Sequence, residues 1–449
     1  MDKLKNQERM TSNSYYRPIQ YLGAKSRTLN EIVAECNRLC VSESYVVDLF
    51  SGSSIVSQAL YKNKNKVIAN DVMGFCCDMS SAMLNFKKTN DAEEEVVGFI
   101  GNLKDGLSDM PVPNCFCEYV QKEREYLCQK NLGGLKELYN ELRQVRNASN
   151  GNDGQIDFIY KHLGEIVSKN ALLVSNYYAG TYFGIKQSLD LDHILNLIYR
   201  SEFDSDWTRC VLLTALYNTC SLIVNSAGKH FAQPIQIKNF DLKKITSHRF
   251  LENRFFRVMD LFVDCVQKIL YVSNDLGKIN DNIVLNEDIC NRRFYDEIGR
   301  HNVSVFYADP PYTAQQYSRF YHIPEVLHSY RYPKLQMFRG DVTQGIYPNN
   351  KYKSPFCSKV GARQAFSKIF ELVRDNNASL VLSYSESKTE ETGNERMVTM
   401  EDILYLASCY LPNHNIKQVE FSFDYKQLNS KAKVISNKED KEFLMVFEK

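Results

Sequence analysis

The sequence has no long hydrophobic run, and this absence excludes a protein with membrane-spanning helices. No stretch of the 449 residues reaches the ~18 consecutive apolar residues of a membrane-spanning helix. The first residues, Met-Asp-Lys-Leu-Lys-Asn, are polar and lack the apolar core of a secretory signal. We therefore expect a cytoplasmic protein that has no membrane partner.

The sequence also lacks an excess of one charge and lacks paired cysteine motifs. Lys and Arg (55) nearly balance Asp and Glu (54), so any contact with a nucleic acid must come from local basic patches. The 13 cysteines include no Cys-x-x-Cys pair, and close pairs such as Cys36/Cys40 and Cys115/Cys117 lack the histidines of a zinc site. We expect no metal site and unpaired, buried thiols.

The most informative stretch is residues 303–312, Val-Ser-Val-Phe-Tyr-Ala-Asp-Pro-Pro-Tyr. A β-prone run must end near Asp309, because Pro310 and Pro311 have no N–H for a β-ladder. If Asp309 and the Pro310 carbonyl accept both hydrogens of an exocyclic amine on a nucleobase, the nitrogen can offer its lone pair to a methyl donor. Tyr312 could stack on the extruded base. The alternative is a surface Asp-Pro-Pro turn.

Other stretches have the pattern of a nucleotide-binding sheet edge. Residues 45–60 predict a strand, a turn at Gly52 and a helix, and residues 66–71 predict a strand that ends at Asp71, 19 residues after Gly52. An acid at this offset is placed to accept from ribose hydroxyls. A strand at 282–289 also ends on acids, and its Asp288 is placed to accept from a purine amino group. A helix N-cap is the alternative for Asp71.

Between these strands the pattern is helical. At 52.0 kDa the chain is long enough for two or three domains. We divide it into a split catalytic domain, 1–90 and 280–449, and a helical insertion, 91–279, that covers the substrate and recognises DNA. Helices are expected at 93–103, 117–130, 135–145, 156–170, 193–199, 207–224 and 254–272.

Two irregular stretches of the insertion, 176–187 and 228–234, combine glycine with aromatic, basic and amide side chains. This mixture suits base stacking and phosphate contact, so Tyr182 and Lys186 are candidate nucleic-acid contacts. The alternative is that both stretches are loops packed between helices.

Residues 331–363 form a basic segment with seven Lys and Arg residues against one acid, a local balance of +6. It predicts a phosphate-binding flap within the catalytic domain, with Arg339, Lys351 and Lys353 as candidate contacts. The alternative is a solvated charged loop. Beyond it we expect helices at 363–374 and 400–411 and strands at 379–384, 418–425 and 442–448.

Taken in chain order, these motifs resemble those of the Dam-like, D12-class DNA adenine-N6 methyltransferases, which use S-adenosylmethionine. The resemblance rests on Tyr21-Leu22-Gly23-Ala24-Lys25, Asp48-Leu49-Phe50-Ser51-Gly52, Asn70-Asp71 and Asp309-Pro310-Pro311-Tyr312. It implies an α/β fold with a Rossmann-like sheet of seven strands, mostly parallel, with one antiparallel strand near the C-terminus. Across the helical insertion the likeness is faint.

The resemblance also implies roles for single residues. Tyr21, Gly23 and Lys25 would lie on the methionine carboxylate side of the cofactor. Asp48, Phe50 and Gly52 would line its methionine and sulfonium, Asp71 would bind the ribose and Asp288 the cofactor adenine. Asp309, Pro310 and Tyr312 would hold the target base. One departure is Ser54, where the family usually has a second glycine.

The resemblance implies a site-specific DNA adenine-N6 methyltransferase that acts on double-stranded DNA as a monomer or weak dimer, in DNA modification or beside a cognate restriction endonuclease. A methyltransferase of cytosine N4 or of RNA is one alternative, although Asp rather than Ser at the first motif position favours adenine. A non-catalytic DNA-recognition subunit of the same fold is the other.

Overall fold

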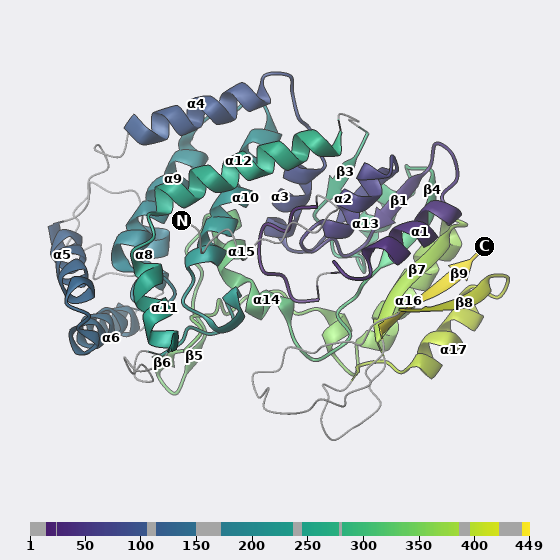
Figure 1. Cartoon of the computed structure of the whole chain (residues 1–449). Helices are drawn as coiled ribbons and strands as arrows, with labels where there is room; N and C mark the ends of the chain where they lie inside the picture. Colours follow the sequence, from purple (N-terminus) through teal and green to yellow (C-terminus); the bar gives the residue numbers. More distant parts are fainter. Residues whose placement is uncertain are drawn as a thin grey trace.

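The structure is a computed structural model that describes residues 15–23, 25–105, 114–149, 172–236, 245–277, 281–385, 396–421 and 442–449. Within these residues a seven-stranded sheet with its covering helices lies beside a larger group of helices (Figure 1). The predicted helix at 156–170 and the end of the strand predicted at 418–425 lie outside the described residues.

The main sheet has the strand order β3-β2-β1-β4-β7-β9-β8. Its strands are β1 (Tyr45–Asp48), β2 (Lys66–Asn70), β3 (Ile283–Leu285), β4 (Val303–Ala308), β7 (Ser379–Ser385), β8 (Asn415–Glu420) and β9 (Glu442–Glu448). Strands β3, β2, β1, β4 and β7 pair in parallel, and β9 runs antiparallel to both β7 and β8. The predicted seven-stranded, mostly parallel sheet with one antiparallel strand is confirmed, and only β8 begins earlier than predicted.

Alternating side chains of the strands supply two apolar layers, because successive residues of a strand point to opposite faces. Val46 and Val305 pack in one cluster, whereas their neighbours Val47 and Phe306 pack in the other. The first layer is covered by α1 (Leu29–Leu39), α2 (Ile55–Lys62) and α3 (Gly74–Met83), and the second by α13 (Arg292–Ile298), α16 (Ala362–Asp375) and α17 (Met400–Tyr410). The sheet is therefore buried on both faces at β1, β2, β4, β7 and β9, whereas the edge strand β8 is mostly exposed.

Between β2 and β3 the chain is helical, as predicted. The helices are α4 (Ala92–Asp105), α5 (Asn114–Cys128), α6 (Leu132–Ser149), α8 (Leu173–Tyr178), α9 (Ile185–Arg200), α10 (Asp206–Ile223), the 3₁₀ turn η3 (Ala227–Lys229), α11 (Ile245–Arg254) and α12 (Val258–Leu276). The stretch 176–187 is less irregular than expected, because α8 and α9 occupy much of it. Helix α9 begins after Gly184, whose N–H donates to the Gln187 side chain at 3.0 Å.

The helical block is attached to the sheet through α3. The Trp207 indole N–H on α10 donates to the Ala82 carbonyl at 3.0 Å, and the Tyr217 hydroxyl donates to Asp78 Oδ2 at 2.6 Å. Residues of α10 and α12 share one apolar cluster with α3, whereas α5 and α6 contribute to a smaller cluster together with residues of α9 and α11. Whether these helices form a separate domain stays a prediction.

After β4 the chain forms short elements before it returns to the sheet. They are α14 (Tyr317–Phe320), α15 (His322–Ser329), the hairpin of β5 (Met337–Phe338) and β6 (Asp341–Val342), and the 3₁₀ turn η5 (Pro355–Cys357). The predicted basic flap thus contains a small hairpin and backbone hydrogen bonds that cross it, such as Gln336 N–H to the Tyr347 carbonyl at 2.7 Å.

Two expectations from composition can be compared with the described residues. No helix among them is both long and apolar enough to cross a membrane. The cysteines that are described there are free thiols, but Cys117, Cys128 and Cys409 are exposed, so the expectation that the thiols are buried is wrong for these three.

Candidate functional site: an acidic pocket at the sheet edge

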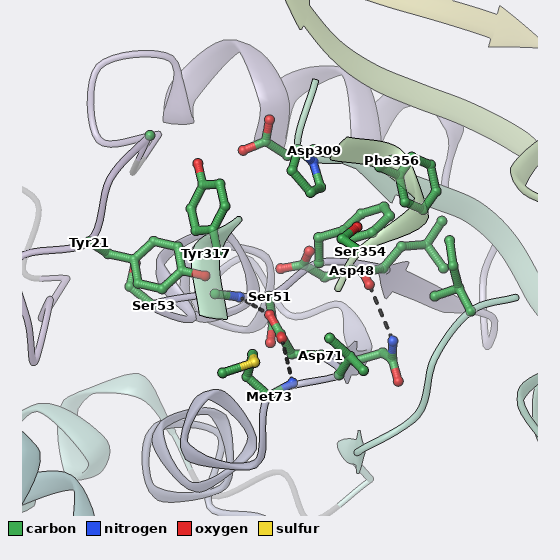
Figure 2. A pocket seen from close by; sticks show the side chains of 18 of the residues that line it. Tyr21, Asp48, Ser51, Ser53, Asp71, Met73, Asp309, Tyr317, Ser354 and Phe356 are labelled. Atoms are coloured by element: carbon green, nitrogen blue, oxygen red, sulfur yellow. Dashed lines mark hydrogen bonds between the residues drawn. The ribbon is translucent and has the colours of Figure 1, made fainter. Parts of the chain in front are cut away.

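A pocket of about 940 Å³, open to solvent, lies where β1, β2, β3 and β4 end. Parallel strands bring their carboxyl ends to one edge, so residues far apart in the sequence meet there. All eight predicted cofactor-binding residues line this pocket: Tyr21, Gly23, Lys25, Asp48, Phe50, Gly52, Asp71 and Asp288. Asp309 lines it as well, and Figure 2 shows Asp48, Asp71 and Asp309 around the same hollow.

Asp48, the last residue of β1, is almost fully buried, with 1% of its surface exposed. The Ser57 hydroxyl donates to its Oδ2 at 2.6 Å, whereas Oδ1 has no hydrogen-bond partner among the described residues. Burial raises the pKa of Asp48 to about 7, against the opposing effect of the Ser57 bond. A buried, unsatisfied acceptor in a pocket wall is suited to a donor group of a ligand.

Asp71 joins the ends of β1 and β2. Its carboxylate accepts from Gly52 N–H at 3.0 Å and from Met73 N–H at 2.9 Å. Burial raises the pKa of Asp71 to about 6, and these two backbone bonds oppose that rise. Gly52 has φ +49°, and a Cβ at this position would lie 2.8 Å from the Tyr21 ring. Glycine is therefore required where the turn passes under Tyr21.

The backbone conformation at Ser54, two residues after Gly52, is one that a glycine would adopt more easily. It has φ 64° and ψ 12°, the left-handed region that non-glycine residues avoid. The residue is completely buried, and its hydroxyl has no hydrogen-bond partner among the described residues. The serine fits the space, but its backbone conformation is a strained one.

Tyrosines form one wall of the pocket. Tyr21 stacks on Tyr321 with 4.6 Å between the ring centroids, and Tyr317 lies 5.6 Å from Tyr21. The Leu22 N–H donates to the Tyr321 hydroxyl at 2.6 Å, which ties the N-terminal segment to α14 and α15. Sequence reasoning missed Tyr317 as a pocket residue. Its only signal was its place in the aromatic stretch that follows the Asp-Pro-Pro-Tyr motif.

The opposite side of the pocket comes from the predicted basic flap. The Tyr352 hydroxyl donates to Asp288 Oδ2 at 2.8 Å, and the Phe356 ring packs edge-on against Phe50 with 5.3 Å between centroids. Both aromatic residues line the pocket together with Ser354. Part of a segment that we interpreted only as a phosphate-binding flap therefore closes the candidate cofactor site.

Asp309 at the end of β4 is held by a lysine. Lys25 Nζ lies 2.9 Å from Asp309 Oδ1 and 2.7 Å from Glu442 Oε1. Burial raises the pKa of Asp309 to about 6, Lys25 opposes this rise and Glu442 adds to it. In this structure the Lys25 ammonium is engaged by two carboxylates, and its contact with a methionine carboxylate stays a prediction.

The other two predicted catalytic residues lie beside the pocket. Pro310 is buried, and Pro311 lines the pocket in its place. The Tyr312 ring packs against Tyr384 with 5.7 Å between centroids, and the Arg396 guanidinium lies 4.8 Å from the centre of the Tyr312 ring. Stacking of Tyr312 on a target base stays a prediction.

The candidate nucleic-acid contacts have different outcomes. Tyr182 is completely buried, and its hydroxyl donates to the carbonyls of Phe231 at 2.9 Å and Gly345 at 3.0 Å. This burial contradicts the prediction for Tyr182, which packs in the core because the turn before α9 folds inward. Lys186 is exposed in the first turn of α9 and forms an ion pair with Asp190.

The basic candidates of 331–363 lie outside the pocket. Arg339 is exposed in the turn between β5 and β6, with its guanidinium 5.3 Å from the Phe338 ring centre. Lys351 donates to Gln336 Oε1 at 3.0 Å, and Lys353 is exposed. Their contact with phosphates stays a prediction.

The fold and the pocket together define a class of protein. A seven-stranded, mostly parallel sheet with one antiparallel strand, and an acid-lined pocket at the carboxyl ends of its parallel strands, are consistent with a methyltransferase fold. Residues 21–178 match the family described as D12 class N6 adenine-specific DNA methyltransferase, so the predicted resemblance is confirmed over this range. The match includes Lys25, Asp48 and Asp71 and ends before Asp309. A comparison with curated proteins finds no match.

Proposed function

We propose that this protein is a site-specific DNA adenine-N6 methyltransferase that uses S-adenosylmethionine and acts on an adenine turned out of the duplex. One observation carries the proposal: Asp309 of the Asp-Pro-Pro-Tyr motif lines the same pocket as all eight residues expected to bind the cofactor. The family match supports the same activity from the N-terminal part of the chain.

The chemistry of the pocket fits this cofactor. The described residues that line it include five carboxylates, those of Asp48, Asp71, Glu287, Asp288 and Asp309, and one ammonium, that of Lys25. S-adenosylmethionine carries a sulfonium and an ammonium against one carboxylate, so an acidic pocket attracts it. The unpartnered Asp48 Oδ1 would accept from the methionine ammonium. Asp71 would accept from the ribose and Asp288 from the cofactor adenine.

When bound, S-adenosylmethionine would supply a methyl group on a positively charged sulfur. Asp309 and the Pro310 carbonyl would accept the two hydrogens of adenine N6, so that the nitrogen lone pair becomes available. With a pKa of about 6, Asp309 is mostly ionised at neutral pH and can act as this acceptor. The nitrogen would gain the methyl group as the bond between methyl and sulfur breaks, with the bonding pair left on the sulfur, and it would then release one proton to the solvent. No covalent bond to the protein is needed, and the part of the chain that the structure describes places no cysteine in the pocket lining.

A second hollow supports a DNA-reading role for the helical block and the basic segment together. It has a volume of about 1090 Å³ and lies between α6, the 180–181 turn, residues 225–236 and residues 342–346. Among the described residues, its lining includes Lys136, Asn140, Arg143 and Gln344 and contains no Asp or Glu. Amide side chains read base edges, and basic side chains contact phosphates.

The test is methyl transfer from labelled S-adenosylmethionine to duplex DNA, followed by digestion to nucleosides. We expect label in N6-methyldeoxyadenosine, and loss of that label with Asp309→Asn. Label in deoxycytidine or in RNA would replace the substrate with one of the alternatives. If the protein binds DNA but transfers no methyl group to DNA or RNA, it is a non-catalytic recognition subunit.

In a cell, the proposed activity would mark DNA alone or protect it from a cognate restriction endonuclease. Because one strand is methylated at a time, a monomer is sufficient for the reaction.

A further inference from the structure

Glu442 reaches the candidate site because β9 runs against the other strands. Glu442 is the first residue of β9 and is paired in register with Ser385, the last residue of β7. The amino end of an antiparallel strand lies at the same sheet edge as the carboxyl ends of its parallel neighbours. Asp309, which follows β4, leaves the sheet at that edge. No motif marks Glu442, which sits in the polar sequence Lys-Glu-Asp-Lys-Glu.

Lys25 connects this glutamate to Asp309. Its ammonium lies 2.7 Å from Glu442 Oε1 and 2.9 Å from Asp309 Oδ1, and the side chains of Lys25, Glu442 and Asp309 are 6%, 12% and 21% exposed. One buried cation is thus shared by two carboxylates, and the group keeps a formal charge of −1. Asp48 and Tyr307 are the other titratable groups that interact with Asp309, and Tyr312 interacts with Lys25.

We propose that Glu442 is a positioning residue for methyl transfer, which holds the Lys25 ammonium between two carboxylates and thereby keeps the Asp309 carboxylate a strong acceptor for the substrate amine. This inference rests on the proposed function. Lys25 engages Oδ1 of Asp309, which leaves Oδ2 to accept from the amine. With Asp309 as its sole partner, Lys25 would form a neutral pair and weaken Asp309 as an acceptor. Glu442 is not among the residues that line the pocket, so it acts through Lys25.

The direction of the effect follows from the charges. Burial and Glu442 both raise the pKa of Asp309, whereas Lys25 lowers it. Removing the charge of Glu442 must therefore lower the pKa of Asp309, so that the carboxylate becomes less basic. A weaker base is also a weaker hydrogen-bond acceptor, so the methyl-transfer rate should fall even at a pH where Asp309 is fully ionised.

The experiment compares Glu442→Gln with two controls. Glu442→Asp keeps the charge and should restore most of the activity. Glu448→Gln removes the same kind of charge from the other end of β9, where Glu448 pairs with Arg38 at 2.8 Å, and should have no effect on the reaction. The measurements are kcat and KM for S-adenosylmethionine against pH. The Asp309 carboxyl is titrated separately by ¹³C NMR on protein with labelled Asp, with its signal assigned by its loss in Asp309→Asn.

For Glu442→Gln we expect a kcat about threefold to tenfold lower at pH 8, an unchanged KM and an acid limb of the rate profile at lower pH than in the wild type. The Asp309 NMR titration should move in the same direction. An unmoved titration would overturn the inference, and so would a lower kcat with an unmoved acid limb, because a purely structural role predicts that result. A wild type that methylates no DNA refutes the proposed function instead, and the NMR titration then still decides whether Glu442 raises the pKa of Asp309.

Discussion

Replacing Lys25 with methionine tests whether the lysine holds the candidate site together. Lys25→Met keeps most of the aliphatic stem, so packing is little changed, but Asp309 and Glu442 lose the cation that contacts both of them at 2.9 and 2.7 Å. Removing one partner of a buried ion pair costs about 3–5 kcal/mol, because a buried charge is left uncompensated. Since Asp309 is 21% exposed, we expect the lower end, about 3 kcal/mol at pH 8.

The cost should depend on pH in one direction only. The pKa of Asp309 is already raised to about 6, and loss of Lys25 raises it further. At pH values between the unfolded pKa of Asp, about 4, and the pKa of Asp309 in the folded variant, the folded variant binds more protons than the unfolded chain. Its stability then falls as the pH rises, by up to about 1.4 kcal/mol per pH unit from the Asp309 carboxyl. Relative to the wild type, the loss is largest at pH 8 and smallest at pH 5.

Denaturant unfolding at pH 5, 6.5 and 8 measures this loss. Trp207, the single tryptophan, is buried where α10 packs on α3, and it reports on the core that continues under the sheet. The control is Lys25→Met combined with Asp309→Asn and Glu442→Gln, which leaves no uncompensated charge and should recover most of the stability at pH 8. A loss that is the same at all three pH values would refute the reasoning.

Three further predictions concern the pocket and the basic segment. Ser54→Gly should raise the free energy of unfolding by about 0.5–1 kcal/mol, because glycine adopts the left-handed backbone without strain although it loses more chain entropy on folding. An unchanged denaturation midpoint would mean that the serine backbone is not strained. Neutralising Lys351 and Lys353 together should lower the salt slope of DNA binding by about 1.8, and an unchanged slope would exclude both as phosphate contacts. Tyr352→Phe removes the hydrogen bond that holds Asp288 and should weaken S-adenosylmethionine binding about twofold to tenfold in calorimetry. Equal affinity would mean that cofactor binding does not need the hydrogen bond between Tyr352 and Asp288.

The sequence by itself determined the sheet and one side of the pocket. All seven strands of the described sheet were predicted. For β1, β2 and β4 the reason is that a buried parallel strand is a short apolar run, and its end is marked by residues such as Asp71 or Asp309. Turns that follow such strands must meet at one edge, so Asp48, Phe50, Gly52, Asp71 and Asp288 could be predicted to lie together. Tyr21, Gly23 and Lys25 follow no strand, and only the family resemblance placed them at this site.

The tertiary structure decided which other side chains complete the site. Glu442 reaches Lys25 only because β9 is inserted antiparallel, and Tyr352 and Phe356 reach the pocket only because the basic segment folds back over it. Tyr182 was predicted as a nucleic-acid contact but is buried, because an aromatic near glycines has the same sequence pattern whether it is exposed or buried. Contacts between distant segments depend on how the chain packs, and no local pattern of residues records that packing.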